Sequence, residues 1–169
     1  MEIERQFLVN TLPVLPVEYD LLRQGYIALL PKIRIRQIGD SYVTLTVKRG
    51  VGLVLEEWET EISREEFDSL AQRILPGTCL IEKRRYCIPL AGGLTAELHV
   101  HEGHLAGFKY VEVEFSSKEE AVAFLPPAWF GREVTEDARF SYGALVQTGG
   151  MAIVKQILRE RSWRFKDIT

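Results

Sequence analysis

The sequence predicts a mainly β protein of the α+β class, in which eight antiparallel strands close into a barrel-shaped tunnel with helices on its periphery. Apolar and polar residues alternate with a period of two through most of the first 115 residues. Glycine and proline residues interrupt this alternation at short intervals, and charged residues collect on one face of each run. Because most links between the runs are short, we expect antiparallel neighbours.

Each predicted strand is a run of alternating residues between two such interruptions. Side chains at positions i, i+2 and i+4 of a strand share one face, so the composition of each face can be read from the sequence. The eight runs are Glu2–Val9, Leu22–Leu30, Lys32–Ile38, Tyr42–Lys48, Leu53–Ile62, Cys79–Ile88, Leu94–His101 and Phe108–Phe115.

Two segments carry the signals of a helix N-terminus. The segments SREE, from Ser63, and SSKEE, from Ser116, both resemble capping boxes, and each precedes an apolar-periodic run. Proline cannot continue a helix, so we expect the first helix to end before Pro76 and the second before Pro126.

The C-terminal part of the sequence is predicted to be helical. Thr135 is a candidate N-cap for a short helix through Leu145. A basic amphipathic helix is predicted over Met151–Phe165. The length of 169 residues fits one domain, residues 1–169, in which 146–169 form a helical extension.

The composition argues against several classes of protein. A net charge of -3 provides no general positive field for nucleic acid. No segment approaches the ~20 apolar residues of a membrane span, and the N-terminus does not resemble a signal peptide, so we expect a cytoplasmic protein without membrane contact. Cys79 and Cys87 would lie about 26 Å apart in one strand, too far for a disulfide.

Acidic residues recur at alternate positions in some strands, and basic residues do so in others. Apolar residues such as Ile33, Val47 and Val113 occupy the opposite faces. The acidic sets are Glu2 with Glu4, Glu57 with Glu59, and Glu112 with Glu114, and Glu97 shares its face with His99 and His101; the basic sets are Lys32, Arg34 and Arg36, then Lys48, then Lys83 with Arg85.

Two arrangements fit this pattern. The charged face is either the solvated side of an antiparallel sheet whose apolar side packs on helices, or the lumen of a closed barrel. Like charges at neighbouring positions repel, and they are tolerated where counter-ions or a ligand compensate them. The separation of acids and bases onto different strands therefore favours a lumen that binds ions.

The two kinds of charged set suit two kinds of ligand. Mg²⁺ and Mn²⁺ take oxygen ligands, and Mg²⁺ commonly links carboxylates to substrate phosphates. The guanidinium fork of arginine matches the geometry of a phosphate. Together they suit phosphoryl transfer, where catalysis is mostly positioning and electrostatic stabilisation.

The opening EIERQFLV resembles the ExExK signature of the CYTH superfamily, the triphosphate tunnel metalloenzymes. The resemblance covers about residues 1–145 and implies an eight-stranded antiparallel tunnel that acts on triphosphate compounds. Further matching segments follow in the family's order: RQGY from Arg23, IRIRQ from Ile33, the strand Thr44–Lys48, EEWE from Glu56, IEKRRY from Ile81, AELHV from Ala96, VEVEF from Val111 and VTEDARF from Val134.

The resemblance also implies roles for individual residues. Glu2, Glu4 and Gln6 occupy the catalytic signature. The implied metal ligands are Glu2, Glu4, Glu112 and Glu114, with Glu57, Glu59 and Glu97 as further acids that face the tunnel. The implied triphosphate-binding cations are Arg34, Arg36, Lys48, Lys83 and Arg85, which Arg139 is expected to join from outside the sheet.

The sequence departs from the family pattern at three positions. Gln6 stands where the signature has lysine, which removes a cation near the reacting phosphate. His99 stands where aspartate is common, and its imidazole favours a borderline metal such as Mn²⁺ or Zn²⁺ over Mg²⁺. His99 shares its face with Glu97 and His101, and these three are candidates for one metal site. Phe140 replaces a tyrosine.

We therefore expect a metal-dependent triphosphatase with Mg²⁺ or Mn²⁺ in a one-metal or two-metal site, Zn²⁺ being less favoured. Inorganic tripolyphosphate is the expected substrate because no aromatic platform for a nucleoside can be assigned. The alternatives are a degenerate tunnel that binds triphosphate or polyphosphate without efficient hydrolysis, and the adenylate cyclase or thiamine-triphosphatase activities of the same family. Edge strands and the apolar helical tail are compatible with a homodimer.

Overall fold

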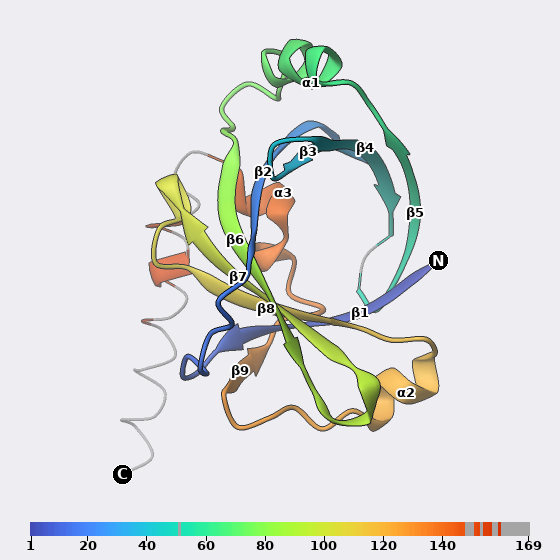
Figure 1. The fold of residues 1–169 in the computed structure, drawn as a ribbon, viewed down its shortest axis with the longest axis vertical. Coiled ribbons are helices and arrows are strands. Elements are labelled where there is room, and N and C mark those ends of the chain that lie inside the picture. The colour runs from blue at the N-terminus through green and yellow to red at the C-terminus, as the bar shows by residue number, and fades with distance from the viewer. Residues whose placement is uncertain (51, 148–150, 153, 157–158, 160–169) are drawn as a thin grey trace.

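A closed barrel of antiparallel strands forms the body of the protein (Figure 1). The computed structural model describes residues 1–50, 52–147, 151–152, 154–156 and 159. Within these residues, nine strands form one sheet in the order β5-β4-β3-β2-β6-β7-β8-β1-β9, and a further pairing of β5 with β1 closes the first eight into a ring. The predicted eight-stranded antiparallel barrel is confirmed.

The barrel strands follow the predicted runs to within a few residues. The alternation of side chains therefore fixes which residues face the lumen, as predicted. The strands are β1 (Glu2–Val9), β2 (Asp20–Leu29), β3 (Lys32–Ile38), β4 (Tyr42–Arg49), β5 (Val54–Glu61), β6 (Ile81–Pro89), β7 (Thr95–Glu102) and β8 (Lys109–Glu114).

The ninth strand was not predicted. β9 (Phe130–Glu133) is four residues long and pairs with the second half of β1, with Phe7 opposite Glu133 and Val9 opposite Phe130. The first residues of β1 pair with β5 instead, with Glu2 opposite Leu55. One edge of β1 therefore pairs first with β5 and then with β9.

Two helices lie outside the barrel, where their serine caps were predicted. In α1 (Arg64–Ala71) the Ser63 hydroxyl accepts a hydrogen bond from the Glu66 amide, and in α2 (Lys118–Ala123) Ser117 accepts one from Glu120. Phe67 of α1 is buried in one cluster with residues of β3 and β4. Figure 1 shows α1 and α2 at opposite ends of the molecule.

The predicted helix from Thr135 to Leu145 is wrong. The chain instead forms two short turns, η3 (Ala138–Phe140) and α3 (Tyr142–Leu145). The Thr135 hydroxyl caps no helix, because it accepts a hydrogen bond from the backbone N–H of Gln6 at 3.0 Å and donates one to the carboxylate of Glu133 at 2.8 Å. Two further single turns are η1 (Ala91–Gly93) and η2 (Gly103–Leu105).

The described residues of the predicted C-terminal helix, 151–152, 154–156 and 159, are helical. Val154 is fully buried in the same core cluster as Tyr26, Tyr110 and Leu145. The rest of Met151–Phe165 lies outside the described residues. Across the described chain, no helix is both long enough and apolar enough to cross a membrane.

Candidate functional site

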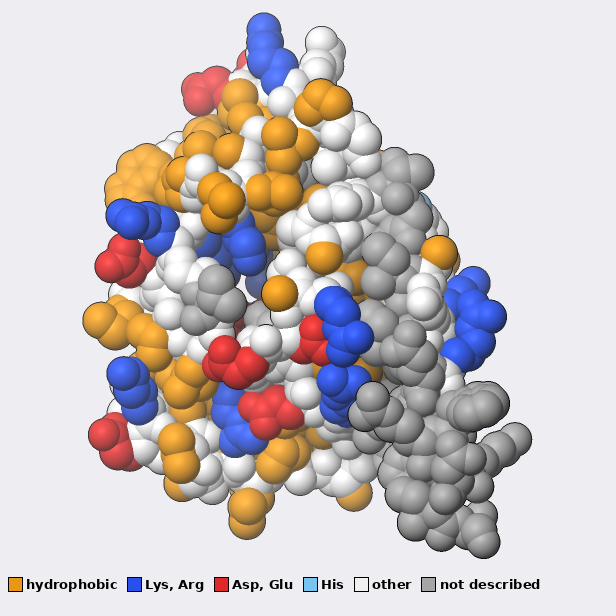
Figure 2. Space-filling model, turned by 180° about the vertical axis from the view of Figure 1, so that it is seen from behind, with side chains coloured by type: hydrophobic (Ala, Val, Ile, Leu, Met, Phe, Trp, Pro, Cys, Tyr) orange, Lys and Arg blue, Asp and Glu red, His pale blue; other side chains and the backbone are white. Residues whose placement is uncertain are grey.

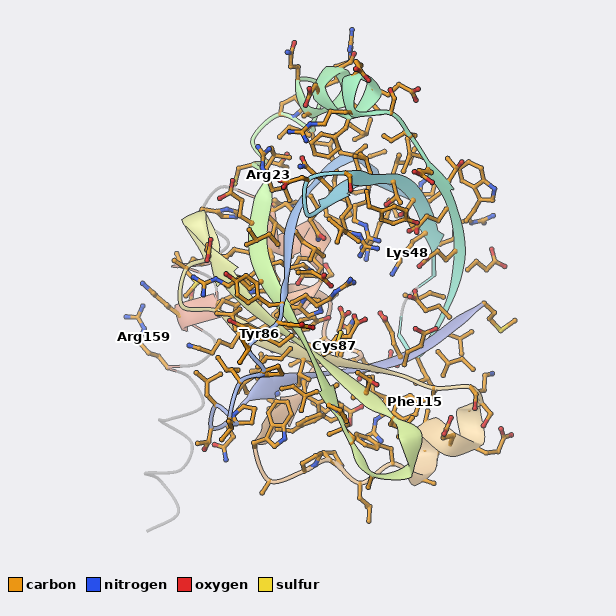
Figure 3. All side chains as sticks on the ribbon, in the orientation of Figure 1. Arg23, Lys48, Tyr86, Cys87, Phe115 and Arg159 are labelled. Atoms are coloured by element: carbon orange, nitrogen blue, oxygen red, sulfur yellow. The ribbon has the colours of Figure 1, made fainter. Side chains whose placement is uncertain are left out.

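A cavity of about 810 Å³ occupies the interior of the barrel. Every site residue predicted from the sequence except Arg139 and His101 lines it. Figure 3 shows Lys48 pointing from β4 into this interior, and Figure 2 shows basic side chains inside the hollow when the molecule is viewed from behind. The alternative of a flat sheet with a solvated charged face is therefore excluded.

The lumen is divided into a basic wall and an acidic wall. The basic side chains come from β4, β3 and β6, and β2, the strand between β3 and β6, contributes Tyr26 and no charge. The acidic side chains come from β7, β8, β1 and β5, which are also consecutive around the ring. The basic wall consists of Lys32, Arg34, Arg36, Lys48, Lys83 and Arg85; the acidic wall consists of Glu2, Glu4, Glu57, Glu59, Glu97, Glu112 and Glu114.

Where β4 and β5 meet, the two walls are joined by ion pairs. Lys48 Nζ lies 2.9 Å from Glu2 Oε2 and 3.2 Å from Glu57 Oε2. Burial alone would lower the pKa of Lys48, but the charges of Glu4 and Glu2 outweigh it and raise that pKa. Lys48 is therefore a permanently charged group that is already neutralised by the acidic wall.

The two arginines of β3 are held much less firmly. Arg34 Nη2 and Arg36 Nη2 lie 4.0 and 3.9 Å from the same oxygen of Glu59. The Nε atoms of both are buried without a hydrogen-bond partner in the described structure. Burial and the neighbouring Arg34 lower the pKa of Arg36 to about 10, which leaves it charged at neutral pH. These guanidinium groups retain donors for an anion in the cavity.

Asp20, which the sequence analysis missed, holds the basic residue at the end of the wall. Strand β2 begins at Asp20, two residues earlier than predicted, and places Asp20 opposite Arg85. Arg85 Nη2 donates to Asp20 Oδ2 at 2.9 Å, and Arg85 Nη1 lies 3.9 Å from Glu97. The alternation of the preceding residues gave no sign of this early start.

On the acidic wall, Glu4 is a buried carboxyl group beside a neutral amide. Gln6 Nε2 donates to Glu4 Oε1 at 2.8 Å. Burial, together with the charge of Glu112, raises the pKa of Glu4 to about 8. The acidic wall therefore carries more carboxyl groups than can comfortably ionise together, which is the condition that a cation relieves.

Glu97, His99 and Glu112 form a group that could hold a metal ion. One ligand atom from each lies within 4.8 Å of the others, and His99 Nε2 is 3.3 Å from Glu112 Oε2. Burial and the Lys83 ammonium lower the pKa of His99 to about 4, so its imidazole is neutral. Burial works against ionisation of Glu112, but His99, Lys83 and Lys48 outweigh it and lower the pKa of Glu112. Two carboxyl groups and a neutral imidazole suit a divalent cation.

His101 does not join this group, although the sequence placed it on the same face. Its Nδ1 bonds the carbonyl of Phe108 at 3.0 Å, and its Nε2 bonds the hydroxyl of Tyr142 at 3.1 Å. Because a carbonyl can only accept, Nδ1 carries the proton and Nε2 accepts from Tyr142. The Tyr142 oxygen then accepts from Lys83 Nζ at 3.0 Å. A chain of hydrogen bonds thus orients Lys83 in the lumen.

Tyr142, the first residue of α3, lines the cavity. No pattern in the sequence indicated this position. Arg139, by contrast, is not brought into the cavity. Its guanidinium bonds Asp137 at 2.9 and 2.7 Å, and it lines a separate pocket with Arg132 and Glu136.

Comparisons with known proteins agree with this architecture. The family model of the CYTH domain matches residues 1–140. The chain is 43% identical over 149 residues to an inorganic triphosphatase of Nitrosomonas europaea, covering 85% of this chain and 95% of the relative. It is 35% identical over 153 residues to an inorganic triphosphatase of Acetivibrio thermocellus, covering 86% and 93%. A solved structure of an inorganic triphosphatase, 40% identical, superposes with a TM-score of 0.66 over 88% of this chain and 95% of that one.

Proposed function

Since this chain belongs to the CYTH domain family, we propose that it is an inorganic triphosphatase, which hydrolyses a phosphoanhydride bond of tripolyphosphate. The observation that carries the proposal is the division of the lumen into a basic and an acidic wall that face one cavity. Two similar proteins named inorganic triphosphatase support it.

The basic wall would bind the phosphate chain. Arg34 and Arg36 have long ion pairs and unpartnered Nε atoms, so a phosphate oxygen can replace weak contacts with short charge-assisted hydrogen bonds. Lys83 is already oriented by Tyr142. Groups held in place in this way stabilise charge that develops during phosphoryl transfer without having to reorganise.

The acidic wall would hold a divalent cation, for which we propose Mg²⁺ or Mn²⁺. Glu97, His99 and Glu112 converge within 4.8 Å, and the buried carboxyl of Glu4 lies on the same wall. When bound, such a cation neutralises charge on phosphate oxygens and acts as a Lewis acid. The imidazole of His99 favours Mn²⁺ over Mg²⁺.

A phosphate-release assay tests the proposal. We expect tripolyphosphate turnover with Mg²⁺ or Mn²⁺, and a loss of about 100-fold or more on Arg36→Ala, since an electrostatic contact to the reacting group is removed. Arg23→Ala is a matched control, because Arg23 lies on β2 with half of its side chain exposed and outside the cavity lining. Equal turnover by Arg36→Ala and the control would refute the assignment of the basic wall.

Binding without hydrolysis is the second candidate function. It is favoured by Gln6, whose neutral amide is occupied by its bond to Glu4 and adds no charge to the lumen. Calorimetric titration with tripolyphosphate beside the release assay separates the two functions. Tight binding without phosphate release would show a binding module, and release from adenosine or thiamine triphosphate in preference to tripolyphosphate would identify a different substrate.

A further inference from the structure

Lys32 is a cation of the basic wall that is not among the triphosphate-binding residues implied by the family resemblance. It is the first residue of β3, lines the cavity and lies directly opposite Lys48 in the β3–β4 register. The two ammonium groups differ in their surroundings. Lys48 is paired with Glu2 and Glu57, whereas the side chain of Lys32 has no hydrogen bond or ion pair with any residue that the structure describes.

Two like charges directly opposite each other on one face of a sheet are destabilising. Lys32 is also half-buried, and burial together with the Lys48 charge lowers its pKa, while Glu4 partly offsets them. The fold therefore bears a cost at this position that Glu4 relieves only in part. An anion inside the cavity would relieve it.

The surroundings of Lys32 indicate which part of the cavity such an anion would occupy. Lys32 pairs with Leu29 at the end of the β2–β3 hairpin, and Leu29 lies against Gly143 of α3. On the opposite wall, the charge that acts on Lys32 is that of Glu4, whose neighbour Gln6 is neutral. Lys32 thus faces this part of the lumen without an ion pair to any described residue, with the acidic wall opposite it.

We propose that Lys32 binds a phosphate group of the substrate at the end of the basic wall where the β2–β3 hairpin turns, and that its positive charge acts there together with those of Arg34 and Arg36. The proposal rests on the proposed function in its choice of tripolyphosphate as the ligand. It assigns a direct phosphate contact to this residue of the basic wall and gives a reason for its unpaired charge.

Lys32→Gln tests the proposal, with Lys109→Gln as the matched control on β8, outside the cavity lining. Calorimetric titration of tripolyphosphate into metal-free protein measures binding apart from turnover. We expect a loss of affinity of about tenfold, which corresponds to ~1.4 kcal/mol, in Lys32→Gln and none in the control. Lys32→Arg should retain most of the affinity. In the release assay, KM should rise more than kcat falls.

A second readout separates a ligand contact from a structural role. If Lys32 were needed for folding, Lys32→Gln would lower the thermal midpoint of the ligand-free protein; we expect that midpoint to stay the same or to rise, since a repulsion is removed. Affinity of Lys32→Gln within twofold of wild type would overturn the role of Lys32 even if wild type releases phosphate normally. Wild type that releases no phosphate, with the loss of affinity intact, would overturn the proposed hydrolysis alone.

Discussion

Removal of one hydroxyl, that of Tyr142, should have a large effect on stability. In Tyr142→Phe the ring remains, but the hydrogen bonds to His101 Nε2, at 3.1 Å, and to Lys83 Nζ, at 3.0 Å, are lost. Both partners are buried, so water replaces these bonds poorly. The contact of the Lys83 ammonium with the ring face, 4.4 Å from its centroid, is retained by phenylalanine.

The expected magnitude follows from these contacts. A buried polar group that loses its partner costs about 1–3 kcal/mol. Two such losses, reduced by the retained ring contact, give an expected decrease of about 2–4 kcal/mol in the free energy of unfolding. This is a sizeable share of the ~5–15 kcal/mol typical of a domain.

Denaturant titration of Tyr142→Phe beside Tyr42→Phe measures the effect. Tyr42 is 45% exposed, and its change should stay within about 0.5 kcal/mol. A double-mutant cycle with His101→Ala should give a coupling energy of about 1 kcal/mol or more, because the two residues share one bond. A decrease below about 0.5 kcal/mol for Tyr142→Phe, at an unchanged m-value, would refute the inferred chain of hydrogen bonds.

Three further predictions concern positions outside the cavity. Arg5 donates twice to Glu133 at 2.8 Å and also to the carbonyls of Ala121 and Phe124. Lysine lacks the forked guanidinium group, so Arg5→Lys should lower the free energy of unfolding, measured in urea, by about 1–3 kcal/mol. An unchanged urea midpoint would contradict this prediction. The hydrogen bonds from Arg5 hold the pKa of Glu133 below its usual value. The stability from this pair is therefore present above the pKa of Glu133 in the unfolded chain, about 4.3, and is lost as the pH falls through its lower pKa in the folded protein. Glu133→Gln should therefore make the free energy of unfolding depend less on pH in the acid range. In Gly25→Ala the new Cβ would lie 2.7 Å from a methyl carbon of Leu80; we expect a cost of about 1–3 kcal/mol from crowding, and thermal melting equal to wild type would show that the neighbours adjust freely.

The barrel could be predicted because strand parity is a property of the backbone itself. β3 matches its predicted bounds, Lys32–Ile38, and its alternation placed Arg34 and Arg36 on the lumen face. β9 could not be found in this way. It has four residues, one of them Gly131, whose Cβ position would lie 3.1 Å from the backbone of β1. Its strand conformation depends on pairing with β1 and not on a pattern of its own.

The candidate site shows the same division. Residues on barrel strands were found because sequence spacing determines their direction. Tyr142 was missed, and Arg139 was expected in the cavity, because both lie in the irregular segment after β9, where tertiary packing decides what each side chain faces. His101 was expected beside a metal only because it shares a strand face with Glu97 and His99. Its two ring nitrogens are instead hydrogen-bonded to the carbonyl of Phe108 and the hydroxyl of Tyr142.

The barrel is closed by one short strand pairing, that of β1 with β5. β6 and β7 share eight register pairs, whereas β1 and β5 share two. Local opening of the β1–β5 pairing therefore requires less free energy than unfolding of the whole barrel. Lys48 links the same two strands through its ion pairs with Glu2 of β1 and Glu57 of β5. Any ion that competes for these carboxylates therefore also alters the stability of the β1–β5 pairing. Hydrogen exchange at the amides of β1 and β5 would report this coupling.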